Sequence, residues 1–356
     1  MDEILMSKVG RHLKSWSTGR AVPDGMSGTG SATVVVEDAR HLQELRDSGV
    51  VGPETVVLVP AGQEEPSHDA LVVGYEGSLS EPGGDVAIAD AIFVQTQDYN
   101  TSPYMSLVGT TLIRITCDAD LDAFLADADL ARNEGAFADF AASQAVQIAD
   151  LSCLGDGSRN DGPRTRLYAN QVGELSTSPG GLRLGSVGDR IEGLVAEWER
   201  INETSAFPCA VGLGAVVTEG RRSEGLGQRL WLGRYLDALD MLRELQGRGI
   251  TEIRVSGFGG RLVPALEDLA DPADASGDRD PMLAWTPEAC YLRVPGSGRL
   301  FALSRTAAQL TEVLLTCGDI ESALDHAERD DLERVAGFLD RNGVRLPVAP
   351  AVGAGV

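Results

Sequence analysis

The sequence predicts a mixed α/β body, built from a mixed sheet with helices, followed by a small C-terminal domain of three strands and three helices. Short apolar runs rich in β-branched residues alternate with helical patterns in the first half of the chain. The longest amphipathic pattern, over residues 230–248, is helical and lies in the second half. Apolar periodicity then stops over residues 271–281, which carry four aspartates, and resumes beyond them.

These patterns divide the chain into four segments. We expect a flexible N-terminal leader over residues 1–30, an α/β body over 31–270, an acidic linker over 271–281 and a compact domain over 282–350. Within the leader, apolar residues recur at helical spacing, so a helix that docks on the body or on a partner is the alternative to a frayed tail; these residues are Leu5, Val9, Leu13 and Trp16.

The body begins with strand patterns and continues mainly with helical ones, which is typical of an α/β arrangement. Strands are expected over residues 32–37, 55–60, 71–75, 86–95, 106–117, 166–170 and 252–256. Helices are expected over residues 38–48, 118–126, 135–149, 189–202 and 230–248.

Composition and charge exclude several classes of protein. With 356 residues and 43% apolar content, the chain can bury a core and is not disordered as a whole. Its net charge is −24, and such a negative surface repels phosphate backbones, so we expect no nucleic-acid partner. It has no run of about 18 apolar residues, so we expect no membrane span. Its five cysteines are scattered without a CxxC pair, which indicates reduced thiols and a cytoplasmic protein.

The familiar motifs of catalysis, cofactor binding and metal binding are missing from the sequence. Residues 25–30 are glycine-rich but lack the Lys-Ser/Thr ending of a phosphate-binding loop, and residues 257–260 lack the spacing of the dinucleotide fingerprint. The four histidines are not at ligand spacing, and no GxSxG nucleophile motif occurs. We therefore expect no catalytic residue, no cofactor and no metal.

The C-terminal domain opens with a hairpin. Residues 290–294 and 299–303 are alternating apolar runs on either side of a Gly/Pro turn, and residues 283–285 add a short third strand. By strand alternation, the side chains of Phe301 and Leu303 point to the face that meets the helices. The backbone amide and carbonyl groups at the edge of their strand stay available for hydrogen bonds to another strand.

Three helices follow the hairpin. Ser304 is placed to cap the first, over residues 305–316, and Asp319 to cap a short second one. The third begins at Asp330 and ends at Asn342, which precedes a glycine. Three strands and three helices in this order predict a winged-helix (β3α3) domain.

Two stretches of this domain carry a resemblance to a known family. Residues 303–310 read LSRTAAQL and residues 335–344 read VAGFLDRNGV. The first resembles the leucine-asparagine-x-threonine-alanine signature of PqqD-like proteins, with Ser304 in place of asparagine, and the second is similar to the last helix and exit of that family. These proteins are recognition elements for precursor peptides in pathways that make ribosomally synthesised, post-translationally modified peptides (RiPPs). The resemblance covers the last fifth of the chain, and an acidic body with such an element is most similar to the recognition proteins of daptide biosynthesis.

The resemblance implies a binding function and a site. In such domains the leader of the precursor peptide adds as an extra strand beside the third strand and inserts apolar side chains between that strand and the last helix. The implied partners are this leader and the modifying enzymes of the pathway, with an oxidoreductase and an aminotransferase as candidates. The peptide-binding residues would be Arg299, Leu300, Phe301, Ala302, Leu303, Arg334, Phe338, Arg341 and Asn342.

Within this set, Phe338 lies about 60° around the third helix from the nearest core position, at 100° per residue. It is therefore either a rim residue of the core or an anchor for the guest peptide. Arg334 and Arg341 lie on the same side and would pair with acidic residues of a leader.

Two other functions remain as alternatives. The first is DNA binding, since many winged helices bind DNA. Residues 282–346 carry seven arginines against ten acidic residues, and the third helix opens with two aspartates. This negative charge disfavours contact with DNA phosphates. The second alternative is that the α/β body is a peptide-modifying enzyme with an unrecognised active site. Because its apolar pattern is self-contained, we expect residues 282–350 to fold alone and to bind the leader.

Overall fold

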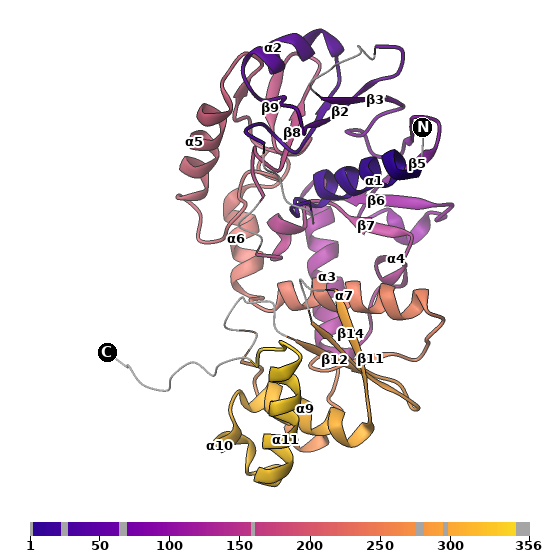
Figure 1. The fold of residues 1–356 in the computed structure, drawn as a ribbon, viewed down its shortest axis with the longest axis vertical. Coiled ribbons are helices and arrows are strands. Elements are labelled where there is room, and N and C mark those ends of the chain that lie inside the picture. The colour runs from indigo at the N-terminus through magenta and orange to yellow at the C-terminus, as the bar shows by residue number, and fades with distance from the viewer. Residues whose placement is uncertain are drawn as a thin grey trace. The chain divides into compact units, whose positions relative to one another are not determined.

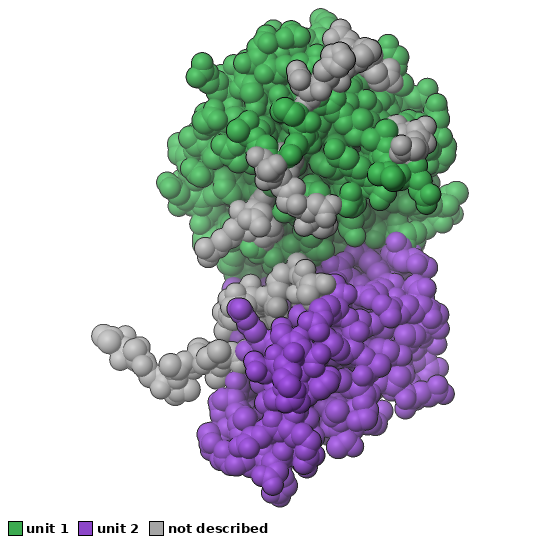
Figure 2. Space-filling view, in the orientation of Figure 1, with its two compact units in different colours: residues 1–124, 145–228 green, residues 125–144, 229–356 purple. Residues whose placement is uncertain are grey.

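The computed structural model describes residues 3–22, 28–63, 70–157, 161–272, 274, 281–294 and 298–346 (Figure 1). The chain forms two compact units (Figure 2). Unit 1 comprises residues 1–124 and 145–228, and unit 2 comprises residues 125–144 and 229–356. The division therefore falls within helix α3 (Asp118–Glu134) and again near residue 228, and not at the expected linker over residues 271–281.

Unit 1 is built on a mixed sheet, as the alternation of strand and helix patterns predicts. Its order in the described residues is β10-β9-β8-β1-β2-β3-β4-β5-β6-β7. Strands β8, β1, β2 and β3 are mutually parallel, as are β5, β6 and β7, while β4 joins the two groups antiparallel to both neighbours. The strands are β1 (Thr33–Val36), β2 (Val56–Pro60), β3 (Leu71–Glu76), β4 (Asp85–Ile88), β5 (Ile92–Asp98), β6 (Thr110–Arg114), β7 (Val146–Ile148), β8 (Arg166–Ala169), β9 (Glu174–Ser176) and β10 (Gly185–Ser186).

Apolar clusters cover both faces of this sheet. Helix α1 (Glu3–Thr18) packs on one face, where its apolar stripe meets side chains of β1 to β6 and β8. Helices α2 (Leu42–Asp47) and α5 (Ile191–Asn202) pack on the other face, over β1, β2, β8 and β9. Helix α6 (Glu219–Gly227) and 3-10 turns at Ala39–His41, Ser102–Tyr104 and Leu151–Leu154 complete the described elements of the unit.

Helix α1 corrects the expectation of a flexible leader over residues 1–30. Val9 is fully buried, Trp16 is 1% exposed, and the indole Nε1 of Trp16 donates a hydrogen bond of 3.0 Å to the carbonyl oxygen of Leu167 in β8. The helical spacing of the apolar residues is the signal for this docked helix, and the burial of its apolar stripe offsets part of the entropy cost of ordering the segment. Residues 1, 2 and 23–27 lie outside the described part of the chain.

Removing the Trp16 side chain tests the docking of α1. We expect Trp16→Ala to lower the free energy of unfolding by roughly 3–5 kcal/mol, the usual cost of emptying a buried aromatic site. Ile4 lies on the same helix and is 82% exposed, so Ile4→Ala is the matched control and should cost less than about 0.5 kcal/mol. Urea denaturation followed by circular dichroism measures both. Equal losses for the two variants would mean that α1 is not docked.

Two of the expected elements of the body are wrong. Residues 86–95 form a hairpin and not one strand, because Ala89 and Asp90 take positive φ angles of 49° and 56° and reverse the chain between β4 and β5. The expected helix over residues 135–149 is a short helix, α4 (Asp139–Ala142), followed by β7. Val146 and Ile148 pair with β6 there, so tertiary pairing overrides the local helical pattern.

Unit 2 contains the predicted C-terminal elements. In its described residues, an antiparallel sheet has the order β11-β12-β13-β14, made of β11 (Arg254–Val255), β12 (Met282–Trp285), β13 (Cys290–Val294) and β14 (Arg299–Leu303). Helices α9 (Arg305–Cys317), α10 (Ile320–Ala323) and α11 (Arg329–Arg341) follow. The hairpin and third strand are confirmed, and so are the N-caps, since Ser304 accepts from the amide of Ala307 and Asp319 from that of Ser322. Strand β11 adds a fourth strand from residues assigned to the body.

Helices pack on both faces of this second sheet. Leu283, Trp285, Cys290 and Leu292 point to the face where α9 and α11 lie. On the opposite face, the guanidinium of Arg293 lies 3.6–3.9 Å from carboxylate oxygens of Asp237, Asp240 and Glu244. These three acids belong to helix α7 (Leu232–Gly247), which is the long helix that the sequence predicts over residues 230–248.

The expected acidic linker begins as part of the folded unit. Asp271 is 6% exposed, and its carboxylate pairs with the guanidinium groups of Arg234 and, at 3.5 Å, Arg261. Asp274 pairs with Arg132 and, at 3.0 Å, with Arg234. Two of the four aspartates therefore neutralise buried arginines, which corrects the linker assignment at this end. Residues 273 and 275–280 lie outside the described part.

The buried carboxylate of Glu312 joins α9 to the segment before β12. It accepts hydrogen bonds from the hydroxyl of Ser256 at 2.6 Å and from the amides of Leu262 at 2.9 Å and Val263 at 2.6 Å. Glu312 is 1% exposed, and this burial raises the pKa of its carboxyl group against the opposing effect of the three donors. Residues 282–350 therefore share buried groups with residues 256–263, and we now expect the folding unit to include this segment and α7.

The role of Glu312 is tested by Glu312→Ala. We expect the free energy of unfolding to fall by roughly 2–5 kcal/mol, because each buried donor left without an acceptor costs about 1–3 kcal/mol. Glu288 is exposed in the turn between β12 and β13, so Glu288→Ala is the control and should change stability by less than about 0.5 kcal/mol. Thermal unfolding of the full chain measures both, and an unchanged Glu312→Ala protein would refute the role of this carboxylate.

Candidate functional site

Strand β14 forms one edge of the unit 2 sheet, since it pairs with β13 on one side and with no other described strand. The direction of its backbone groups follows from the register. The carbonyl of Leu283 accepts from the amide of Ser256, so the backbone of Leu283 points away from β13. Leu283 pairs with Leu292, whose backbone groups therefore point to β14 and bond to those of Phe301. Because backbone direction alternates along a strand, the amide and carbonyl groups of Leu300 and Ala302 point away from β13, toward the edge of the sheet. Two residues of the predicted site thus present hydrogen-bonding groups at an open edge.

The side chains of β14 alternate as the sequence predicts. Phe301 pairs across the strands with Leu292 and packs, half-buried, on a cluster with Leu339 and Val344. Leu303 lies on the same face. Leu300 and Ala302 lie on the opposite face, beside Arg293 and Tyr291. The apolar surface beside the open edge is therefore on the side of α11.

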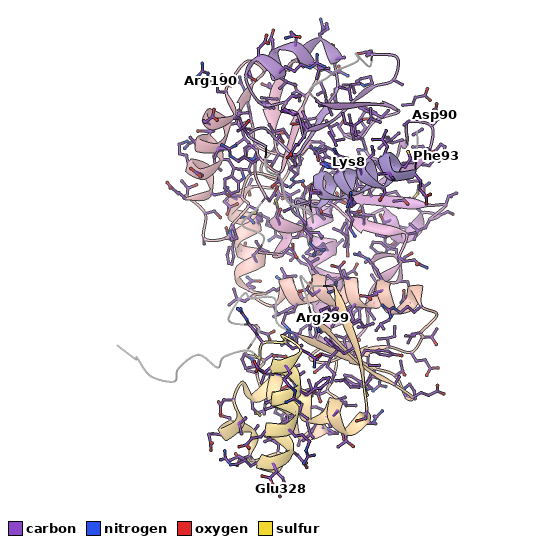
Figure 3. All side chains as sticks on the ribbon, viewed as in Figure 1. Lys8, Asp90, Phe93, Arg190, Arg299 and Glu328 are labelled. Carbon is purple, nitrogen blue, oxygen red and sulfur yellow. The ribbon has the colours of Figure 1, made fainter. Side chains whose placement is uncertain are left out.

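Arg299 links the start of β14 to the end of α11. Its guanidinium lies 4.8 Å from the centre of the Phe301 ring, and its Nη1 donates a hydrogen bond of 2.5 Å to the carbonyl of Asn342 (Arg299 is labelled in Figure 3). Asn342 in turn donates from Nδ2 to the carbonyl of Phe338 at 2.9 Å. These contacts bring together four of the predicted site residues: Arg299, Phe301, Phe338 and Asn342.

Phe338 is a surface residue. It is 39% exposed, whereas its neighbours on α11, Val335, Ala336 and Leu339, all belong to the apolar clusters of the unit. This exposure fits both a rim residue of the core and an anchor for a guest peptide. Its role as an anchor stays a prediction.

Arg334 and Arg341, the two arginines of the predicted site that belong to α11, are exposed. Arg334 forms an ion pair of 2.8 Å with Asp331, one turn earlier, and its side chain is 72% exposed. Arg341 is exposed beside Gly337. Neither has a contact with β14 among the described contacts, so their pairing with an acidic leader stays a prediction.

Three of the cysteines in the described part of the chain are buried, namely Cys153, Cys209 and Cys290. Burial raises the pKa of the Cys153 and Cys290 thiols, and that of Cys209 to about 12, which lowers the fraction of reactive thiolate. Over the described residues, no group of three or more His, Cys, Asp and Glu side chains is placed to hold a metal ion. None of the helices in the described ranges is long and apolar enough to cross a membrane.

Sequence reasoning missed a polar cleft in unit 1. It has a volume of about 480 Å³ and lies where β8, β1, β2 and β3 end, with Glu37 and Tyr75 among its lining residues. Glu37 directly follows the β-branched run of β1. This position at the end of an expected strand was the only sign of the cleft in the sequence.

Comparison with known proteins gives no relative. No family model, no curated protein and no solved structure matches this chain. A functional assignment for this chain therefore has to be argued from its own residues and their geometry.

The exposure of Phe338 allows binding to be separated from packing. We expect Phe338→Ala to change the free energy of unfolding by less than about 1 kcal/mol and to weaken leader binding by roughly 1–3 kcal/mol, the range for an anchor residue. Its neighbour Leu339 is 1% exposed, so Leu339→Ala should cost about 2–5 kcal/mol of stability. Thermal unfolding and fluorescence anisotropy with a labelled leader measure the two effects. A Phe338→Ala protein that melts like Leu339→Ala but binds normally would remove Phe338 from the site.

Proposed function

We propose that the chain is a non-catalytic binding protein of RiPP biosynthesis. Its C-terminal strands and helices act as a PqqD-like winged-helix element that captures the leader of a precursor peptide by strand addition on β14. The bound precursor is then presented to modifying enzymes of the same pathway in the cytoplasm. The resemblance to daptide recognition proteins makes an oxidoreductase and an aminotransferase the candidate enzymes.

The observation that carries this proposal is the open edge of β14 with an apolar surface beside it. Strand addition needs outward backbone donors and acceptors, which Leu300 and Ala302 supply, and pockets for alternate side chains. Phe301 and Leu303 are partly buried on the α11 side, where they would form the wall of such a pocket, and Phe338 offers an exposed aromatic surface on α11 itself. Arg334 and Arg341, both exposed on α11, suit acidic positions in a leader.

Charge favours a peptide over nucleic acid as the ligand. The chain carries a net charge of −24, and α11, which would be the DNA-reading helix, has Asp330 and Asp331 in its first turn. A negatively charged helix in this position would be repelled by phosphates. The genomic neighbourhood offers an independent check, since a short peptide gene beside oxidoreductase and aminotransferase genes supports the daptide assignment.

The strand-addition mode predicts that an outward amide of β14 matters for binding. Ala302→Pro removes the amide of an exposed edge residue, and proline is tolerated on edge strands. We expect it to weaken binding by about 1 kcal/mol or more, because at least one intermolecular hydrogen bond is lost. Ala302→Ser keeps the amide and is the matched control, with affinity expected within about twofold.

The measurement is fluorescence anisotropy of the full chain with a fluorescein-labelled leader from a precursor peptide encoded beside the gene. Circular dichroism confirms that both variants are folded. If the wild-type chain fails to bind the leader, the function is wrong. If Ala302→Pro and Ala302→Ser bind equally well, the leader binds without β14.

A further inference from the structure

The polar cleft of unit 1 lies at a point where the order of its parallel strands reverses. From β1 the chain moves to β2 and then β3 on one side, while β8 pairs with β1 on the other side. In open α/β sheets, ligands bind outside the carboxyl ends of the strands at such a reversal. Glu37 directly follows β1 and Asn170 directly follows β8, so both stand at this crevice.

The cleft is built around the Glu37 carboxylate. Its Oε1 accepts a hydrogen bond from the hydroxyl of Ser80, and the hydroxyl of Tyr168 on β8 also bonds to this carboxylate. Burial raises the pKa of Tyr168 and of Tyr75, and the charge of Glu37 adds to this effect, so both phenols stay protonated. A carboxylate has about four acceptor positions, and the two donors found among the described residues, Ser80 and Tyr168, leave about two of them for a ligand.

The loop after β3 forms the opposite wall. Gly77 has a φ of 88°, and a side chain there would clash with the carbonyl oxygen of Asp85, so glycine is needed for this path. The loop then brings the hydroxyl of Ser78 to 3.0 Å from that of Ser80 and places Glu81 on the cleft. The ten lining residues include two carboxylates, Glu37 and Glu81, and no lysine or arginine.

Charge and acceptor content define the complementary ligand. Within the described residues no lysine or arginine forms an ion pair with Glu37, although this side chain is half-buried. A protonated amine donates three hydrogen bonds and has the opposite charge. Among the described residues, no group of three or more His, Cys, Asp and Glu side chains is placed to hold a metal ion. The volume of about 480 Å³ is in the range of small-molecule sites.

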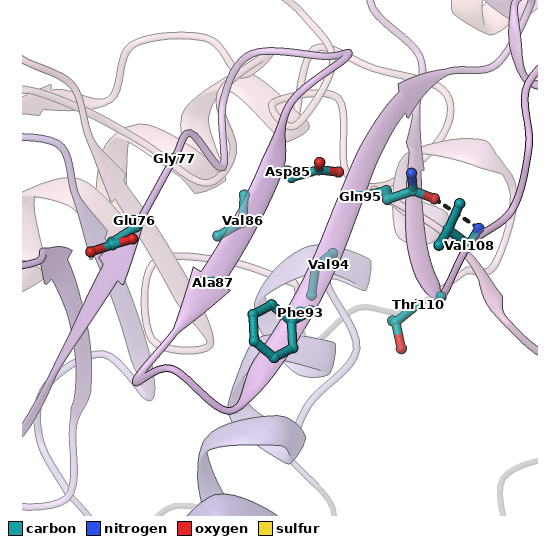
Figure 4. A pocket seen from close by; sticks show the side chains of 11 residues that line it. Glu76, Gly77, Asp85, Val86, Ala87, Phe93, Val94, Gln95, Val108 and Thr110 are labelled. Atoms are coloured by element: carbon teal, nitrogen blue, oxygen red, sulfur yellow. Dashed lines mark hydrogen bonds between the residues drawn. The ribbon is translucent and has the colours of Figure 1, made fainter.

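A second hollow of unit 1 differs in chemistry. It has a volume of about 570 Å³ and lies over β4, β5 and β6, with Phe93, Val94 and Val108 on its surface (Figure 4). Gln95 accepts from the amide of Val108 at 3.2 Å within it. The side chain of Phe93 is 66% exposed, and no feature of the structure specifies an occupant for this apolar groove.

We propose that the cleft at the carboxyl ends of β8, β1, β2 and β3 is a binding site for a small organic amine, whose ammonium group is held by Glu37. Ser80 and Tyr168 fix the carboxylate, Glu81 contributes a second negative charge, and the Asn170 turn closes the site at β8. This site is separate from the β14 edge and does not depend on the leader-binding function.

The test uses three probes of equal length that differ only in their ends: 1,4-diaminobutane, 1,4-butanediol and succinate. Isothermal titration calorimetry with the full chain is done at about 0.15 M salt, which screens weak surface attraction. We expect saturable one-site binding of the diamine and none of the diol or succinate. No saturable binding of the diamine, or equal binding of the diol, would overturn the proposal.

Carboxylate variants locate the binding. Glu37→Gln should weaken diamine binding by about tenfold or more, the effect of losing a charge-assisted hydrogen bond. Glu81→Gln, at an exposed position of the same cleft, should weaken it by about two- to fivefold. Glu203 is exposed at the end of α5, so Glu203→Gln has the same change in net charge and should bind as wild type. Equal affinities for all three variants would show that the amine is held by the overall negative charge and not by the cleft. Leader binding should be unchanged throughout, which separates this outcome from the function of β14.

Discussion

The buried carboxylates of Asp271 and Glu312 hold unit 2 together. Asp271 joins Arg234 of α7 to Arg261, and Glu312 joins α9 to the backbone of residues 262 and 263. Buried charges are costly unless they are paired or fully hydrogen-bonded, so these groups specify one arrangement of the segments that they connect. The position of β14 depends on this arrangement. Helix α7 packs on the sheet that contains β14, and β11, in the segment before β12, pairs with the same sheet.

The local parts of unit 2 could be predicted from the sequence. The hairpin of β13 and β14 follows from two alternating runs around a turn, and the caps at Ser304 and Asp319 follow from short polar residues before apolar periodic segments. The missing parts are non-local. Strand β11 has only two residues and was assigned to the body, and no local pattern indicates that aspartates of an apparent linker neutralise Arg234.

The candidate site was predictable to the same extent. Strand alternation is enough to place Phe301 and Leu303 on one face, and helical spacing is enough to place Phe338 beside the buried stripe of α11. The contact of Arg299 with Phe301 and Asn342 was not predictable, because it depends on how the end of α11 meets the start of β14. The cleft at Glu37 was missed for a similar reason, since strand order is a property of the whole sheet.

The two edges of the unit 2 sheet differ in length, and this difference has a consequence for self-association. Strand β11 offers two residues, whereas β14 offers five. A long open edge is a template for any extended chain, including the same strand of another molecule. Two copies meeting along β14 would each carry the full negative charge of the chain, and their mutual repulsion opposes pairing at low ionic strength. Salt weakens that repulsion far more than it weakens backbone hydrogen bonds, so any pairing of two copies through this edge would increase with ionic strength.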